Sequence, residues 1–174
     1  IFAPVMGVVA LAYAYVLAMR VVKSPAGNER MQEISNAIHE GAMAFLLREY
    51  KILVIFVIVM FVLIGSLINW PTAISYITGS IASVLAGYIG MNVATKANVR
   101  TANAAFEGQN KALGIAFSGG AVMGMSVVGL GLTGLGILYF VFGNPADVKS
   151  FDVINGFALG ASSIALFARV GGGI

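Results

Sequence analysis

Residues 52–95 form a run of 44 positions without a single charged side chain. A helix that crosses the hydrocarbon core of a bilayer needs about 20 apolar residues, so this run is long enough for two crossings. Near its middle, Asn69, Trp70, Pro71 and Thr72 supply a turn between them. Helices of soluble domains carry a charged or polar face toward water, and this run has no such face. The chain is therefore predicted to lie in a membrane.

The composition supports the same class of protein. Hydrophobic residues make up 59% of the chain and charged residues 10%, against about 45–50% and about 25% in soluble domains. The chain has no cysteine, which excludes disulfides and thiolate metal sites. The basic residues form no cluster with interleaved aromatic residues, so we expect no nucleic-acid partner.

Three further uncharged runs complete the pattern. We predict an all-α fold, a polytopic transmembrane helical bundle that crosses the lipid bilayer five times within this chain. Strands of a membrane barrel are not favoured, because such strands alternate polar and apolar residues and these runs do not. The expected spans are residues 1–21, 50–69, 72–94, 114–142 and 152–170.

The basic residues near the span ends are unevenly divided between the two sides. Eight lie in or beside the loops at 22–49 and 95–113, whereas the opposite side has only Lys149. Because cytoplasmic loops carry an excess of Lys and Arg, we expect these two loops in the cytoplasm and the N-terminus outside. The eight residues are Arg20, Lys23, Arg30, Arg48, Lys51, Lys96, Arg100 and Lys111.

The first of these loops is predicted to be helical. Asn28 can cap the helix, and Glu29 follows in the first turn, where the helix dipole favours an anion. We expect one long helix that starts near Asn28, continues through the second span and projects into the cytoplasm. A helix that lies flat on the lipid surface is the alternative. The apolar residues at helical spacing are Met31, Ile34, Ile38, Ala42, Phe45 and Leu46.

Small residues recur four positions apart in the last three spans. Such ridges allow two helix backbones to approach closely in lipid. We therefore predict that these spans pack inside a larger bundle, and that the second span, which is bulky on all faces, contacts lipid broadly. The alternative is that membrane helices are simply rich in glycine. The ridges are Gly79, Ser83 and Gly87; Ala86, Gly90 and Ala94; Ala116, Gly120 and Gly124; and Gly156 and Gly160.

Two patterns resemble functional sites but have simpler explanations. The glycines at 129, 131 and 134 fit the spacing G-x-G-x-x-G, yet a dinucleotide site needs a preceding strand and a helix that opens at the glycines. Here they lie inside an apolar span. His39 is the only histidine, and no second histidine or cysteine accompanies it, so we interpret it as a surface residue of the loop helix and expect no metal site.

Arg169 is the strongest candidate for a functional residue. It lies at the end of the last span and is followed by Gly171, Gly172 and Gly173. A charge that faces the interior of a membrane bundle usually pairs with another group and marks an ion or substrate path. An arginine that extends to the cytoplasmic headgroups is the alternative. The small residues on its helix face, which suggest contact with protein, are Ala158, Ala161, Ser162 and Ala165.

Four segments of the chain suggest a family. The ending GASSIALFARVGGGI resembles the fifth span of the membrane-integral pyrophosphatases, which are ion pumps driven by inorganic pyrophosphate. The segment MQEISNAIHEGAMAFLLREYK is similar to their first cytoplasmic loop. TKANVRTANAA and GGAVMGMSVVGLGL resemble the region of their third and fourth spans. The resemblance runs in order over essentially the whole chain.

The resemblance implies a prokaryotic cell-membrane protein with about sixteen spans that works as a homodimer. The family hydrolyses pyrophosphate at a cytoplasmic funnel and exports H+ or Na+, with Mg2+ and in some members K+ as cofactors. Arg169 would belong to the ionic gate beneath the hydrolytic centre. Gly171, Gly172 and Gly173 would lead into the acidic motif that holds magnesium and pyrophosphate.

That acidic motif does not occur in this chain, which has seven acidic residues and no D-x-x-x-D arrangement near the glycines. Hydrolysis of pyrophosphate with metal ions needs several carboxylates. We therefore expect the chain to be the first quarter of a pump, with no catalytic or metal-binding residue and no activity by itself. The choice between H+ and Na+ and the dependence on K+ stay open. The rival functions are a secondary transporter or channel and a non-catalytic membrane scaffold subunit.

Overall fold

The computed structural model describes residues 2–143 and 151–172. These residues form five helices and no strand, and each helix is long and apolar enough to cross a membrane. The predicted all-α helical bundle is thereby confirmed. The helices are α1 (Phe2–Lys23), α2 (Glu29–Leu67), α3 (Trp70–Ala105), α4 (Gln109–Phe142) and α5 (Asp152–Gly172).

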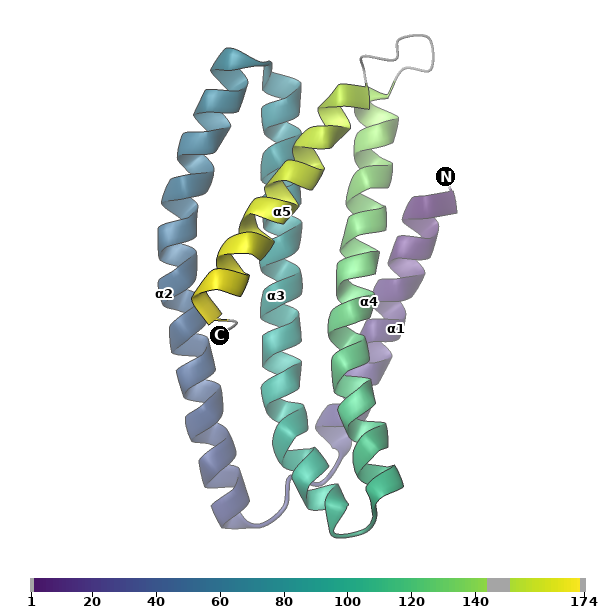
Figure 1. The fold of residues 1–174 in the computed structure, drawn as a ribbon. Helices are drawn as coiled ribbons and strands as arrows, with labels where there is room; N and C mark the ends of the chain where they lie inside the picture. Colours follow the sequence, from purple (N-terminus) through teal and green to yellow (C-terminus); the bar gives the residue numbers. More distant parts are fainter. Residues whose placement is uncertain (1, 144–150, 173–174) are drawn as a thin grey trace.

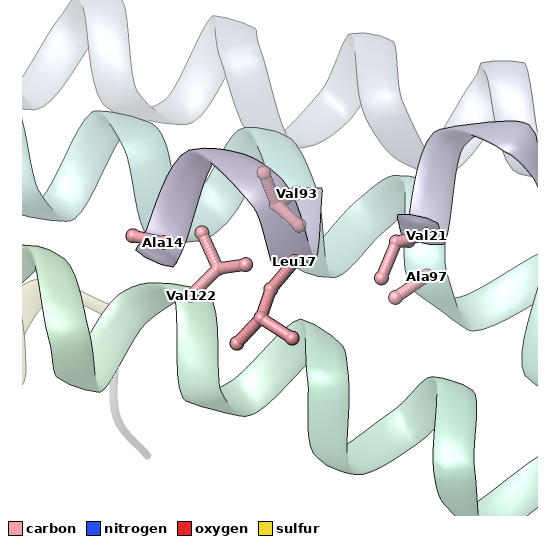
Figure 2. Close-up of a cluster of buried hydrophobic side chains, with 6 residues drawn as sticks. All are labelled: Ala14, Leu17, Val21, Val93, Ala97 and Val122. Atoms are coloured by element: carbon pink, nitrogen blue, oxygen red, sulfur yellow. The ribbon is translucent and has the colours of Figure 1, made fainter. Parts of the chain in front are cut away.

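The helices pack in a bundle in which α3 is central (Figure 1). It packs extensively against α4 and α5 and also against α2, while α1 packs mainly against α4. Helix α5 runs obliquely across α3, from the end of α4 toward α2 (Figure 1). A buried cluster joins three of the helices: Ala14, Leu17 and Val21 of α1, Val93 and Ala97 of α3, and Val122 of α4 (Figure 2).

The long second helix is confirmed, including its start. Asn28 has an extended backbone, and its side-chain oxygen accepts a hydrogen bond of 2.9 Å from the backbone N–H of Met31. The 39 residues that follow are one continuous helix. At 1.5 Å per residue it is about 58 Å long, well beyond the roughly 30 Å of a hydrocarbon core. This length supports the expectation that part of α2 projects from the membrane.

The turn predicted in the middle of the uncharged run is also present. Helix α2 ends at Leu67, and Asn69 caps α3 by accepting a 2.8 Å hydrogen bond from the backbone N–H of Thr72. Pro71 lies in the first turn of α3, where the missing N–H of proline costs no helical hydrogen bond. Local sequence chemistry therefore determines this connection.

The apolar residues in the first half of α2 are not all on the side that the bundle covers. Ile34 and Ile38 are about half exposed, whereas the side that turns toward α3 includes His39. His39 is not the surface residue that we expected: it is half-buried, and its Nδ1 lies 2.8 Å from Oγ1 of Thr95 in α3. The reason is that the approach of α3, and not the hydrophobicity of α2 alone, selects the buried face.

Arg100 has a structural role in addition to its place among the basic residues that predict the orientation of the chain. Its guanidinium extends from α3 to the end of α1 and donates hydrogen bonds to the carbonyls of Ser24, at 3.0 Å, and Val22, at 3.2 Å. The last carbonyls of a helix have no partner within the helix. Arg100 therefore satisfies the end of α1 and fixes it against α3.

Candidate functional site

The crossing of α5 over α3 depends on glycines from both helices. A Cβ atom added at Gly160 would lie 2.9 Å from Oγ of Ser80 and closer still to the carbonyl oxygen of Tyr76. Added at Gly156 or Gly79, it would collide with backbone of the opposite helix. Carbon atoms essentially never approach other heavy atoms this closely. The predicted ridges at these three glycines are therefore true contacts, and they allow the two backbones to touch.

The same crossing buries polar side chains. Thr72, Ser75, Tyr76 and Ser80 of α3 are all less than 9% exposed. Ser80 donates to the carbonyl of Tyr76 at 2.9 Å, but Ser75 Oγ and Tyr76 OH have no hydrogen-bond partner among the described residues. The contact between α3 and α5 is thus tight and polar, unlike the apolar cluster between α1, α3 and α4.

An open groove lies beside this crossing where α5 begins. It has a volume of about 680 Å³ and passes between the α2–α3 turn and α5. Its polar lining consists of Asn69, Thr72, Asp152, Asn155 and Ser162. Asp152 lies in the first turn of α5, where the helix dipole favours a negative charge. The orientation expected from the basic residues would place this groove on the outer side.

Arg169 lies at the opposite end of α5, in its last turn, and its side chain is exposed. The turn is held against α2 by an edge-to-face contact between Phe167 and Phe56, whose ring centroids are 4.8 Å apart. Helix α5 continues through Gly171 and Gly172, so these two glycines extend the helix beyond the predicted end of the span at residue 170. Gly173 is outside the described residues.

Most of the small residues that share a face with Arg169 are exposed among the described residues. The packed side of α5 carries Gly156, Phe157, Gly160 and Ile164, all buried. Ala158, Ser162 and Ala165 are exposed, and Ala161 is half-buried. Within the described part of the chain, the side of α5 that leads to Arg169 therefore remains uncovered. Whether that side faces protein is still a prediction.

The ridge predicted in α4 has no partner at two of its glycines among the described residues, so its contact stays a prediction. A Cβ added at Gly120 or Gly124 meets no atom within 4 Å, and the contact with α3 goes through Gly119, next to Ala97. The contact between α1 and α4 was missed altogether. Gly7 in α1 faces Gly129 and Thr133 in α4, and Gly136 faces Pro4. The helical spacing of Gly129, Thr133 and Gly136 was a usable signal, and it gives Gly129 a packing role.

Comparison with known proteins identifies the family of this chain. A family model described as "Inorganic H+ pyrophosphatase" matches residues 8–174. The chain belongs to this family. The match includes all four segments that suggested the membrane-integral pyrophosphatases, and it covers the candidate residue Arg169 and the glycines after it.

Curated relatives of this pyrophosphatase family extend over the whole chain. It is 59% identical over 174 residues to a protein of Clostridium tetani named "Putative K(+)-stimulated pyrophosphate-energized sodium pump". It is 44% identical over 174 residues, 99% of the chain, to a "K(+)-insensitive pyrophosphate-energized proton pump" of Methanosarcina mazei. It is 39% identical over 184 aligned positions, 95% of the chain, to a "K(+)-stimulated pyrophosphate-energized sodium pump" of Thermotoga maritima. The chain spans about a quarter of the length of these relatives.

The described residues of this family member offer few groups for metal chemistry. Among them there is no set of three or more His, Cys, Asp or Glu side chains that could hold a metal ion. What they provide is a tight, partly polar helix crossing, a groove at one end of it and an arginine at the other.

Proposed function

We propose that the protein to which this chain belongs is a pyrophosphate-energised ion pump. It would hydrolyse inorganic pyrophosphate and couple the reaction to export of H+ or Na+ across the membrane. The observation that carries the proposal is the family match over residues 8–174, together with identities of 39–59% to proteins whose names state this activity. The five helices suited to span a membrane support it.

The cofactors and the assembly follow from the same resemblance. Mg2+ would accompany pyrophosphate and be held by carboxylates supplied outside this chain, because magnesium binds oxygen ligands and substrate phosphates. K+ would stimulate the pump if it follows the sodium-pump relatives. The pump would work as a homodimer in a prokaryotic cell membrane. Its N-terminus would be outside and the loops 22–49 and 95–113 in the cytoplasm, as the basic residues indicate.

Within this pump, Arg169 would act at the ion gate. Three observations support the role: its place in the last turn of α5, the anchoring of that turn by Phe167 on Phe56, and the glycines that begin two residues after it. The guanidinium is always charged and presents several donors in a rigid plane. It would therefore hold a carboxylate of another span and release it as the ion passes. Gly171, Gly172 and Gly173 would lead into the site that binds pyrophosphate.

The test is an assay of Mg2+-dependent pyrophosphate hydrolysis and of ion uptake into vesicles that contain the full-length protein. We expect hydrolysis and uptake together. The transported ion is identified by measuring the uptake of each ion, and by measuring hydrolysis with and without Na+ and K+. Na+ is the first to examine, because the 59% identical relative is named a sodium pump. Absence of pyrophosphate hydrolysis from folded, purified protein would overturn the proposal and favour a secondary transporter or channel.

The role of Arg169 has its own test. We expect Arg169→Ala to abolish coupled ion uptake, whereas Arg30→Ala should leave it intact, since Arg30 is exposed and pairs only with Glu33 on the same helix. Unchanged uptake in Arg169→Ala would refute the gate and point to a scaffold role for this part of the chain. Because the chain has no cysteine, a thiol placed at position 169 can also show which side of the membrane reaches it.

A further inference from the structure

Glu49 is a buried carboxyl group that the proposed function does not use. It lies in α2, one residue before the expected span at 50–69. Both of its carboxylate oxygens are inaccessible to solvent, and neither has a hydrogen-bond partner among the described residues. The ion pairs of the described residues, Arg30 with Glu33 and Lys111 with Glu107, lie instead on exposed surfaces. Glu49 therefore differs from Glu33 and Glu107, whose carboxylates are exposed and paired with a basic side chain.

Protein packing explains the burial of Glu49. Helical spacing places it on the same side of α2 as Leu46, Leu53 and Phe56. Leu46 and Leu53 are 6% and 3% exposed, and Phe56 contacts Phe167 of α5. The carboxyl group thus lies on the side of α2 that packs against the rest of the bundle.

No positive group among the described residues is placed to keep this carboxyl ionised. Its neighbours along the helix, Arg48 and Lys51, are exposed. On α3, the guanidinium of Arg100 is bonded to carbonyls of α1 and of its own helix, and Lys96 makes no ion pair. Arg169 of α5 is exposed. The adjacent hydroxyl, that of Tyr50, donates to the carbonyl of Val84 at 3.1 Å.

A carboxylate that is shielded from water and has no partner is much less favourable than a hydrated one, and such a group usually becomes neutral instead. Desolvation by burial accordingly raises the pKa of Glu49. The protonated acid carries no charge and tolerates apolar surroundings far better. The geometry and the direction of the pKa shift therefore both favour the protonated form of Glu49.

We propose that Glu49 is a proton-binding site on the packed side of α2, next to the contact of Tyr50 with Val84 of α3. Its carboxyl group takes one proton from water and holds it at pH values at which a hydrated glutamate, with a pKa near 4.3, is ionised. The site is separate from Arg169 and goes beyond the proposed function, because proton binding at Glu49 is measured without pyrophosphate or ion transport.

The test is infrared spectroscopy of the purified full-length protein as the pH is varied. Glu49→Gln keeps the shape of the side chain and cannot ionise, and Glu40→Gln is the matched control, since Glu40 is exposed on the same helix. We expect a carbonyl band of a protonated carboxyl, sensitive to D2O, that is lost in Glu49→Gln and retained in Glu40→Gln. Its titration midpoint should lie above that of a hydrated glutamate. Retention of the full band in Glu49→Gln would overturn the proposal.

A second measurement uses stability and does not depend on band assignment. The pKa of Glu49 is higher in the folded than in the unfolded protein, so the folded state binds more protons and stability falls as pH rises from the unfolded value through the folded one. Glu49→Gln lacks this loss. We therefore expect the wild-type melting temperature to fall relative to Glu49→Gln as pH rises through this window. A difference in melting temperature that stays constant with pH would refute the site. So would a difference that shifts in favour of the wild type as pH rises, which is the result expected if a cation elsewhere in the protein pairs with Glu49.

Discussion

Replacement of Gly160 by alanine tests whether the crossing of α5 over α3 requires backbone contact. The new Cβ would lie 2.9 Å from Oγ of Ser80 and from the carbonyl carbon of Tyr76, whereas ordinary contacts begin near 3.4 Å. The carbonyl oxygen of Tyr76 is closer still and belongs to the backbone, which cannot turn away, so the helices must separate by more than about 0.5 Å. Overpacking of this kind costs about 1–3 kcal/mol.

Gly124→Ala is the matched control. Gly124 lies within α4 and was predicted to form the same kind of ridge, but a Cβ there meets no described atom within 4 Å. Alanine is favoured over glycine in a helix interior by up to about 1 kcal/mol. Gly124→Ala should therefore be neutral or slightly stabilising. Because the same helix preference acts in Gly160→Ala, the two variants should differ in stability by the overpacking cost, about 1–3 kcal/mol.

The assay is thermal unfolding of the full-length protein in detergent, followed by fluorescence-detected size-exclusion chromatography. We expect a lower midpoint for Gly160→Ala than for the wild type, and an unchanged or higher midpoint for Gly124→Ala. A Gly160→Ala variant as stable as Gly124→Ala would refute the reasoning, since it would show that α3 and α5 have room for a methyl group between their backbones.

Three further changes test other contacts. Arg100→Ala should cost about 1–3 kcal/mol because it leaves carbonyls at the end of α1 without donors, and limited proteolysis near residue 25 should become faster. Asn69→Ala removes the cap of α3 and should cost about 1 kcal/mol, measured as a lower unfolding midpoint; a midpoint equal to the wild type would contradict the cap. Gly129→Ala should lower the unfolding midpoint, because the new Cβ would collide with Leu11. Gly131→Ala should not, since a Cβ there meets no described atom within 4 Å. Equal midpoints for the two variants would show that Gly129 has no packing role.

The sequence by itself determined the membrane class, the helices and the family. The uncharged runs are long enough to cross a bilayer. They favour helices, because a helix satisfies its backbone hydrogen bonds within its own segment when it lies in lipid. Asn28 and Asn69 cap α2 and α3 as local chemistry predicts. Motifs such as the ending with Arg169 carried enough specificity to indicate the family that the comparison then showed.

Only the tertiary structure decided which side of each helix is covered. Periodicity states which residues share a face, but the partner of that face comes from a distant segment. Gly160 and Gly124 look alike in sequence, yet among the described residues only the first lies against a neighbouring backbone. His39 and Glu49 belong to a segment that the sequence predicts to be a hydrated loop, yet His39 contacts Thr95 of α3 and the carboxyl oxygens of Glu49 are inaccessible to solvent. Burial depends on where distant helices cross, and no local pattern contains that information.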